Sequence, residues 1–116
     1  MKSEFTESVN FIVWSKFNKI AREYLFAIPN GGSRHAAEAN NLKKQGVRKG
    51  VSDYFLAYPA KGKHGLWIEL KKDKKCKATK EQADWLRKMH ELGYEAKLAF
   101  GAAEAMQAVE DYLRIG

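Results

Sequence analysis

Asp53, Glu69 and Lys71 have side chains of the types and spacing that phosphodiester chemistry needs. Side chains alternate between the two faces of a β-strand, so a strand over residues 66–71 places Glu69 and Lys71 together on one face. The aliphatic side chains of the same run then point the other way. Because an unpaired charge is costly to bury in a sheet, the two groups either pair with each other or line a site.

Asp53 makes a site plausible, because it starts the apolar run 54–58 that precedes the run 66–71. The short link between the runs contains Pro59 and two glycines and predicts an antiparallel hairpin. The start of one hairpin strand lies beside the end of the next, so Asp53 is expected near Glu69 and Lys71. On pattern alone, Asp53 could equally be a turn aspartate, and Glu69 and Lys71 a surface ion pair.

Two converging carboxylates repel unless a cation or a shared proton holds them together. A hard divalent ion such as Mg²⁺ or Mn²⁺ takes oxygen ligands of this kind. Such an ion can polarise a phosphate and lower the pKa of a bound water. We therefore expect Asp53 and Glu69 to be metal ligands, and Lys71 to orient or deprotonate the attacking water or to stabilise developing charge.

The charge distribution favours a polyanionic partner. The net charge is +7, and residues 61–80 alone hold eight lysines against two acids. A basic stripe beside a more neutral remainder is typical of nucleic-acid binding, although a solvated, solubilising surface has the same composition. The candidate DNA-contacting cations are Arg34, Lys43, Lys44, Arg48, Lys49, Lys72, Lys74, Lys75 and Lys77.

The elements that must position these groups follow from periodicity. Apolar residues at helical spacing predict a helix over residues 4–24, and short apolar runs predict strands at 25–28 and 95–100. Helices are expected at 34–45, ended by Gly46, at 79–92, opened by a capping box from Thr79 to Gln82, and at 102–113. With the hairpin, this order predicts an α/β fold, a mixed sheet flanked by helices.

The bulk properties bound the class of protein. A chain of 116 residues, 45% hydrophobic and 30% charged, fits one globular domain over residues 1–116. No apolar run is long enough to span a membrane, and the first residues lack a signal-peptide core, so a cytoplasmic setting is expected. Cys76 is the single cysteine, which excludes an internal disulfide framework and a cysteine-based zinc site.

The motifs together resemble the VRR-NUC nucleases, a branch of the PD-(D/E)XK superfamily. The resemblance covers nearly the whole chain and departs from the usual pattern at Ser52, where a proline is common. The matching stretches are Ile28-Pro29-Asn30-Gly31-Gly32, Gly46-Val47-Arg48-Lys49-Gly50-Val51-Ser52-Asp53, Trp67-Ile68-Glu69-Leu70-Lys71 and Glu81-Gln82.

The resemblance implies a restriction-endonuclease-like core and a site with assigned roles. Asp53, Glu69 and the backbone carbonyl of Leu70 would bind the metal, Mg²⁺ or Mn²⁺, and Lys71 and Gln82 would be catalytic. A further acid is implied on the first helix. We expect Glu7, as a catalytic residue and an optional metal ligand, because residues 7–11 best match the family's helix start; Glu4 is the alternative. For Gln82, a capping role is compatible with the functional one.

The function implied is metal-dependent, structure-selective cleavage of DNA, with four-way (Holliday) junctions or other branched DNA as substrate and a homodimer as the active form. Flap, nicking or restriction-like specificity is an alternative, and a non-catalytic DNA-binding module is a third possibility. Asn30 and Gly31 could approach a phosphate closely or form an ordinary turn. His35 and His64 are expected to be solvated or to contact phosphate, not to bind metal.

Overall fold

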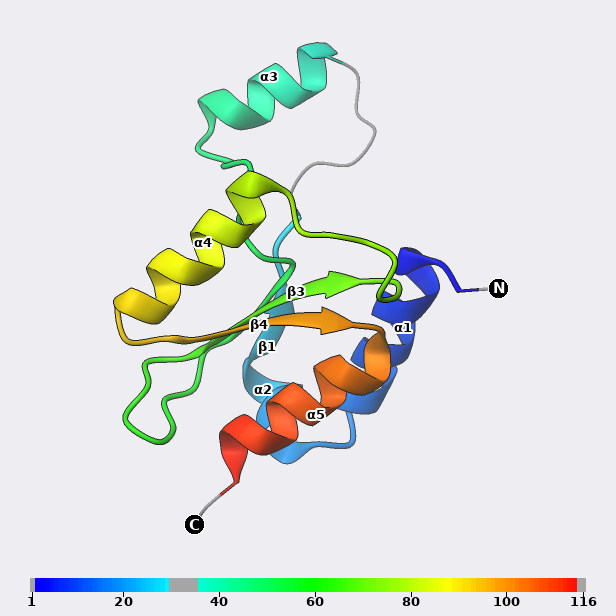
Figure 1. Cartoon of the computed structure of the whole chain (residues 1–116), viewed down its shortest axis with the longest axis vertical. Helices are drawn as coiled ribbons and strands as arrows, with labels where there is room; N and C mark the ends of the chain where they lie inside the picture. Colours follow the sequence, from blue (N-terminus) through cyan, green and yellow to red (C-terminus); the bar gives the residue numbers. More distant parts are fainter. Residues whose placement is uncertain (1, 30–35, 115–116) are drawn as a thin grey trace.

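The computed structural model describes residues 2–29 and 36–114. Within these ranges the chain forms a four-stranded sheet with helices on both faces (Figure 1). The elements, in chain order, are α1 (Glu4–Ser15), α2 (Lys19–Tyr24), β1 (Leu25–Ala27), α3 (Ala36–Lys44), β2 (Tyr54–Leu56), β3 (Leu66–Lys71), α4 (Lys80–Glu91), β4 (Glu95–Phe100) and α5 (Ala102–Leu113).

The sheet is mixed, as the sequence predicts. The strand order is β1-β2-β3-β4; β1–β2 and β2–β3 are antiparallel, and β3–β4 is parallel. The expected hairpin is therefore confirmed as β2 and β3. A parallel neighbour requires a crossover connection, and α4 supplies it between β3 and β4.

The first helical segment differs from the prediction. One helix was expected over residues 4–24, but the structure has two, α1 and α2. Asn18 has an extended backbone, and its side chain accepts the N–H of Ala21 at 2.9 Å, which caps α2. The apolar periodicity continues through the break, so it does not predict the helix boundary that the Asn18 cap creates.

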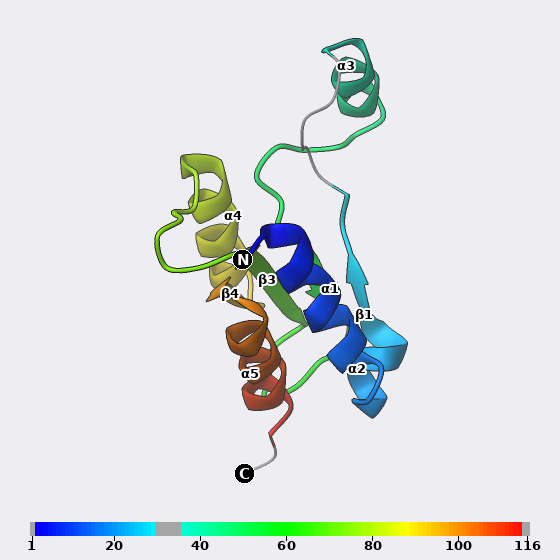
Figure 2. The ribbon, with the colours of Figure 1, turned by 90° about the vertical axis from the view of Figure 1, so that its right-hand side faces the viewer.

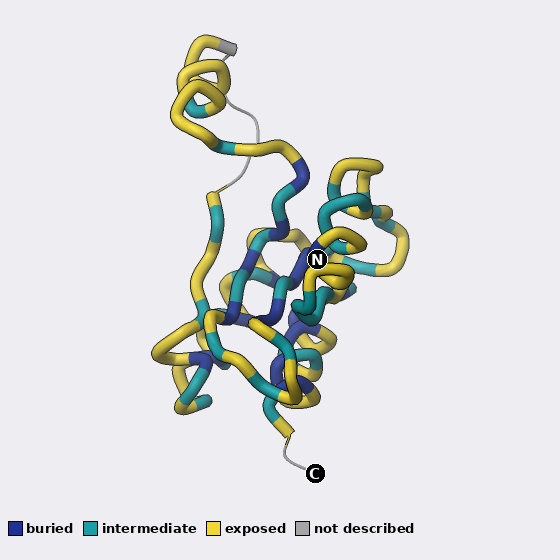
Figure 3. Tube along the Cα trace, turned by 90° about the vertical axis from the view of Figure 1, so that its left-hand side faces the viewer, coloured by how far each residue is buried: buried dark blue, intermediate teal, exposed yellow. Residues whose placement is uncertain are grey.

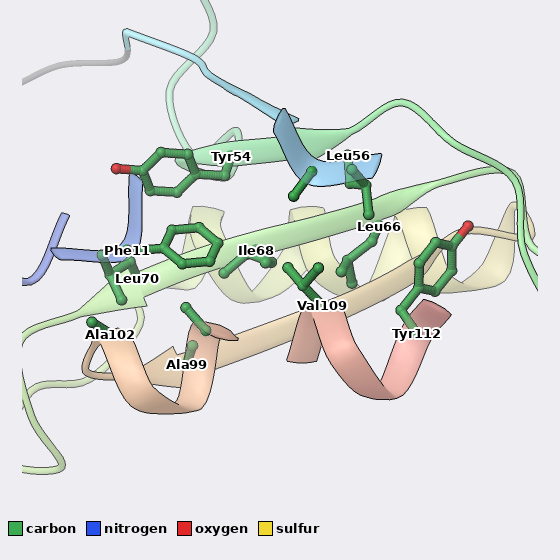
Figure 4. Close-up of a cluster of buried hydrophobic side chains, with 12 residues drawn as sticks. Phe11, Tyr54, Leu56, Leu66, Ile68, Leu70, Ala99, Ala102, Val109 and Tyr112 are labelled. Carbon is green, nitrogen blue, oxygen red and sulfur yellow. The ribbon is translucent and has the colours of Figure 1, made fainter. Parts of the chain in front are cut away.

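The main core lies between the sheet and the pair α1 and α5. Leu66, Ile68 and Leu70 point to this side and are completely buried (Figure 4). Phe11 from α1 and Val109 from α5 meet them there. Since alternate residues of β3 fill this core, Trp67, Glu69 and Lys71 face the opposite side, where α4 lies.

The second face of the sheet is covered by α4 and packed with aromatic rings. Trp85 of α4 stands edge-on to Trp67, with ring centroids 5.2 Å apart. The predicted capping box is present: Thr79 accepts the N–H of Gln82, and Gln82 accepts the N–H of Thr79. None of the helices within the described ranges has the length and apolar character needed to cross a membrane.

Helix α3 stands away from the body of the domain (Figures 1 and 2). Its residues from 37 to 44 are exposed, apart from a half-buried Leu42 (Figure 3). Gly46 has a φ of +102°, which suits the helix stop that the sequence predicts. The chain returns to the body at Gly50, where a Cβ would lie 2.7 Å from Glu81, so glycine is needed for this close approach to α4.

Candidate active site

Asp53 and Glu69 lie opposite each other at one end of the sheet. The β2–β3 register pairs Tyr54 with Ile68 and Phe55 with Trp67. The next step along this register brings Asp53 to Glu69, as the hairpin predicts. The Leu70 N–H donates to Asp53 Oδ2 at 2.7 Å, so the carboxylate is anchored to the backbone of the strand that carries Glu69.

Glu69 is almost completely buried, with 1% of its surface exposed. Its Oε2 lies 3.7 Å from Lys71 Nζ, and its Oε1 is buried without a hydrogen-bond partner. Lys71 is itself only 12% exposed, so little water screens this pair. The contact between Glu69 and Lys71 expected as the plain alternative is thus present, but it lies on an interior strand and beside a second carboxyl group.

Burial raises the pKa of both carboxyl groups. Burial, followed by the charge and hydrogen bond of Asp53, raises the pKa of Glu69 to about 8 against the opposing effect of Lys71. Burial also raises the pKa of Asp53, while the Leu70 N–H and the hydrogen bond from Glu69 act in the other direction. Glu69 therefore holds the proton near neutral pH, and Asp53 accepts the hydrogen bond.

The backbone of Leu70 adds a third oxygen to this corner. The N–H groups of Glu95 and Gly101 donate to the carbonyls of Gly65 and Lys71. Odd-numbered residues of β3 thus direct their backbone groups to β4, and even-numbered ones to β2. The Leu70 carbonyl accordingly points to the Asp53 side, as its N–H does.

This donor set fits a small divalent cation. The half-buried carboxyl group of Asp53 and the buried one of Glu69 repel when both are ionised, and Glu69 Oε1 has no hydrogen-bond partner, so a cation would relieve both penalties. Across the described residues, no three His, Cys, Asp or Glu side chains gather as a metal cluster. The set instead suits Mg²⁺ or Mn²⁺, which commonly take one or two carboxylates and complete their coordination with water and substrate phosphate.

Glu7, the expected acid of the first helix, has a different partner. Its Oε1 accepts the N–H of Ala102 at 2.9 Å, and the residue is 8% exposed. Gly101, the N-cap of α5, has no side chain to fill this role, so Glu7 supplies the missing cap from a distant segment. Its carboxylate is committed to the start of α5.

The charge of Glu4, unlike that of Glu7, is among the causes that raise the pKa of Glu69, after burial and Asp53. Burial raises the pKa of Tyr54, and the charges of Asp53 and Glu4 raise it further. Glu4 is also exposed and so accessible to a ligand. This placement favours the alternative, Glu4, over Glu7, and the assignment stays a prediction.

Gln82 is on the first turn of α4, above the same face of the sheet as Glu69. Trp85 packs on Trp67, and α4 runs back against β3 before the parallel strand β4. Since α4 is antiparallel to β3, Gln82 lies toward the same end of the sheet relative to Trp85 as Glu69 does relative to Trp67. Because Gln82 Oε1 accepts the N–H of Thr79, its amide nitrogen is the atom left for a ligand.

The basic residues lie on two segments, the region of α3 and the loop that follows β3. The described candidates are exposed; they are Lys43, Lys44, Arg48 and Lys49 in the first segment and Lys72, Lys74, Lys75 and Lys77 in the second. The second segment begins directly after Lys71. The remaining candidates, Asn30, Gly31 and Arg34, lie outside the described residues, as does His35.

His64 and Ser52 lie at opposite ends of the β2–β3 hairpin. His64 is exposed, as expected of a solvated side chain, and lies just before β3 at the end away from Glu69, with its ring centroid 5.4 Å from that of Tyr94. Ser52 was considered only as a departure from a motif, yet it is completely buried with an unpartnered hydroxyl directly before Asp53. The polar type of Ser52 within an apolar environment was the only available signal.

No family model matches the chain, and no curated protein matches it. Among solved structures, one described as a VRR_NUC domain protein is similar over 100% of this chain and 93% of its own, with a TM-score of 0.86 and 27% sequence identity. The fold and this likeness support a nuclease domain. This structural likeness confirms the resemblance to VRR-NUC domains that the motifs of the chain show.

Proposed function

We propose that this protein is a metal-dependent, structure-selective DNA endonuclease that hydrolyses phosphodiester bonds in four-way junctions or other branched DNA, with two copies acting together. The observation that supports this proposal is the pairing of the buried Glu69 carboxyl group with the half-buried Asp53 carboxyl group beside Lys71. A structural ion pair does not need a second carboxyl group, whereas a site for a divalent cation gains a ligand from it.

Asp53, Glu69 and the Leu70 carbonyl would hold the metal. A bound Mg²⁺ or Mn²⁺ supplies a polarised phosphate, an activated water and stabilisation of the leaving oxygen. The Leu70 N–H keeps Asp53 in position through its 2.7 Å hydrogen bond. Lys71, which is held near Glu69 and shielded from solvent, would orient a water or neutralise charge that develops on the phosphate.

Glu4 is the acid that we assign to the first helix in this proposal. It is exposed at the start of α1, and its charge acts on the same carboxyl pair. It can accept hydrogen bonds from water held above Glu69. The amide nitrogen of Gln82 approaches from the α4 side, so water and phosphate would be contacted from two helices.

The substrate class follows from the charge around the centre. Exposed lysines follow Lys71 directly in the chain, and more lie on and after α3, which projects from the body. Basic groups on two separate segments can contact phosphates of two DNA arms. This arrangement favours branched DNA over a single straight duplex.

The deciding experiment is cleavage of a synthetic four-way junction with Mg²⁺ or Mn²⁺ by the wild type and by Glu69→Gln. The variant is expected to lose activity by at least about a hundredfold, while its DNA binding, measured in EDTA, is kept. Glu110→Gln, which changes an exposed acid on α5, is the matched control. If Glu69→Gln cleaves as fast as the wild type, the proposed chemistry is wrong.

Specificity is tested separately with a panel of substrates of equal length. Four-way junctions are expected to be cut faster than flaps, nicked duplexes and intact duplexes. Equal rates on all substrates would exclude structure selectivity while leaving the nuclease assignment intact. Metal-independent binding with no product from any substrate would identify a DNA-binding module instead.

A further inference from the structure

Helix α1 has an apolar stripe on its solvent side. Phe5, Val9 and Val13 follow one another at four-residue intervals, and Phe17 continues the interval in the turn after the helix. Their exposed fractions are 79%, 43%, 53% and 86%, which include the two highest among the exposed large hydrophobic residues. We refer to these four residues as the α1 stripe.

The stripe is separate from the face that α1 buries. Glu7, Phe11 and Ser15 are the buried residues of the helix, and they point to α5 and the sheet. Residues two positions away lie about 200° around a helix, so the stripe faces almost directly away from the core. A helix that is apolar on both sides is normally buried on both sides. Something therefore covers the stripe.

The spacing of the stripe points to a second copy of the chain as that partner. In a twofold interface the same patch must be complementary to itself. The order Phe, Val, Val, Phe at equal intervals reads the same in both directions. Two antiparallel α1 helices would thus place Phe5 against Phe17 of the partner subunit and Val9 against Val13 of the partner subunit, with the large rings outside and the small side chains between.

The charges along the helix also favour the antiparallel arrangement. Glu4 lies in the first turn of α1, and Lys16 and Lys19 follow its last turn. Antiparallel packing brings the acidic end of one helix to the basic end of the other and opposes the two helix dipoles. A chain with a net charge of +7 resists self-association elsewhere, whereas residues 1–30 have four basic and three acidic residues.

We propose that the α1 stripe is a twofold, antiparallel interface between two copies of this chain. The interface rests on the proposed function only for its role: a dimer would present two cleavage centres to one DNA molecule. The evidence for the interface itself is the exposed, self-complementary stripe.

The first test measures mass by sedimentation and light scattering across a wide range of protein concentration. The wild type is expected to be a dimer, and Val9→Glu, which introduces charge at an already exposed position, is expected to weaken dimerisation by at least about a hundredfold. Leu92→Glu is the matched control, because Leu92 is 62% exposed at the end of α4 and outside the stripe. A monomeric wild type, or a Val9→Glu variant as dimeric as the control, overturns the proposal.

The second test addresses the register. Val9→Glu and Val13→Lys chains are each expected to be monomeric alone and to form a mixed dimer when combined. In antiparallel register, the carboxylate introduced at position 9 of one chain faces the ammonium introduced at position 13 of the other. If the mixture stays monomeric, this register is wrong.

Circular dichroism shows whether each chain is folded. Cleavage of a nicked duplex by the Val9→Glu monomer reports on the catalytic centre independently of pairing. A folded monomer that still cuts one strand separates failure of the interface from failure of the nuclease assignment.

Discussion

At the residue scale, the carboxyl pair makes the stability of the metal-free protein depend on pH. Burial and the neighbouring Asp53 raise the pKa of Glu69 to about 8, against an ordinary value of 4.5. The folded protein therefore holds a proton that the unfolded chain releases between these two values, and stability falls as pH rises through this window. The pKa of Asp53 is raised as well, which acts in the same direction.

We predict that Mn²⁺ raises the Tm more at pH 8 than at pH 5.5. At the higher pH the cation replaces an unfavourable pair of charges, whereas at the lower pH it must displace the proton on Glu69. Glu69→Gln should remove most of the pH dependence and most of the metal effect. Scanning fluorimetry with EDTA and with Mn²⁺ at both pH values measures this, and equal metal shifts at the two pH values would contradict it.

The sequence was sufficient to predict the central group, because strand alternation and the hairpin are local rules that place Asp53, Glu69 and Lys71 together. It was not sufficient to choose between Glu4 and Glu7. That choice depends on Gly101, which follows β4 far along the chain and has no side chain to cap α5. Neither helical periodicity nor motif spacing contains that information.

At the element scale, β4 and α5 were predicted with the bounds that the structure shows, since strong patterns end at clear stop residues. The predicted helix over 4–24 failed because Asn18 starts a new helix inside a continuous apolar pattern. A local cap therefore decides where the first helical segment breaks, and a tertiary contact between Glu7 and the start of α5 decides which acid of α1 serves structure.

The contact between α1 and α5 gives a second prediction. Glu7→Ala leaves the Ala102 N–H without its acceptor and should cost about 1–2 kcal/mol of unfolding free energy, measured by urea denaturation. Glu7→Gln, which keeps an acceptor oxygen, should be less destabilising and should retain cleavage. Glu4→Gln should lower cleavage without loss of stability. The reverse pattern would restore Glu7 as the acid of the active site.

At the scale of the whole molecule, charge is distributed over segments that project from the sheet. Lys43 and Lys44 are exposed near the end of α3, a helix that stands apart from the body. If they contact phosphates, replacing both with alanine should weaken DNA binding and reduce the slope of log affinity against log salt concentration by about 2.

The control for this measurement is Lys88→Ala combined with Lys97→Ala, which removes the same charge from α4 and β4. Titrations of labelled junction DNA at several salt concentrations give the slopes. An equal loss in both double variants would show that only net charge matters and that α3 makes no specific contact.

The way the chain leaves and rejoins the sheet has a consequence for how such a protein can diversify. The Ile28 N–H donates to the Asp53 carbonyl at 2.8 Å, so the segment containing α3 departs and returns at neighbouring points of β1 and β2. Strand β3, which carries Glu69 and Lys71, lies outside this excursion. If the proposed function is right, insertions, deletions or exchange of this excursion can change which DNA shapes bind without changing the carboxyl pair. Substrate preference and catalysis can then evolve at separate rates.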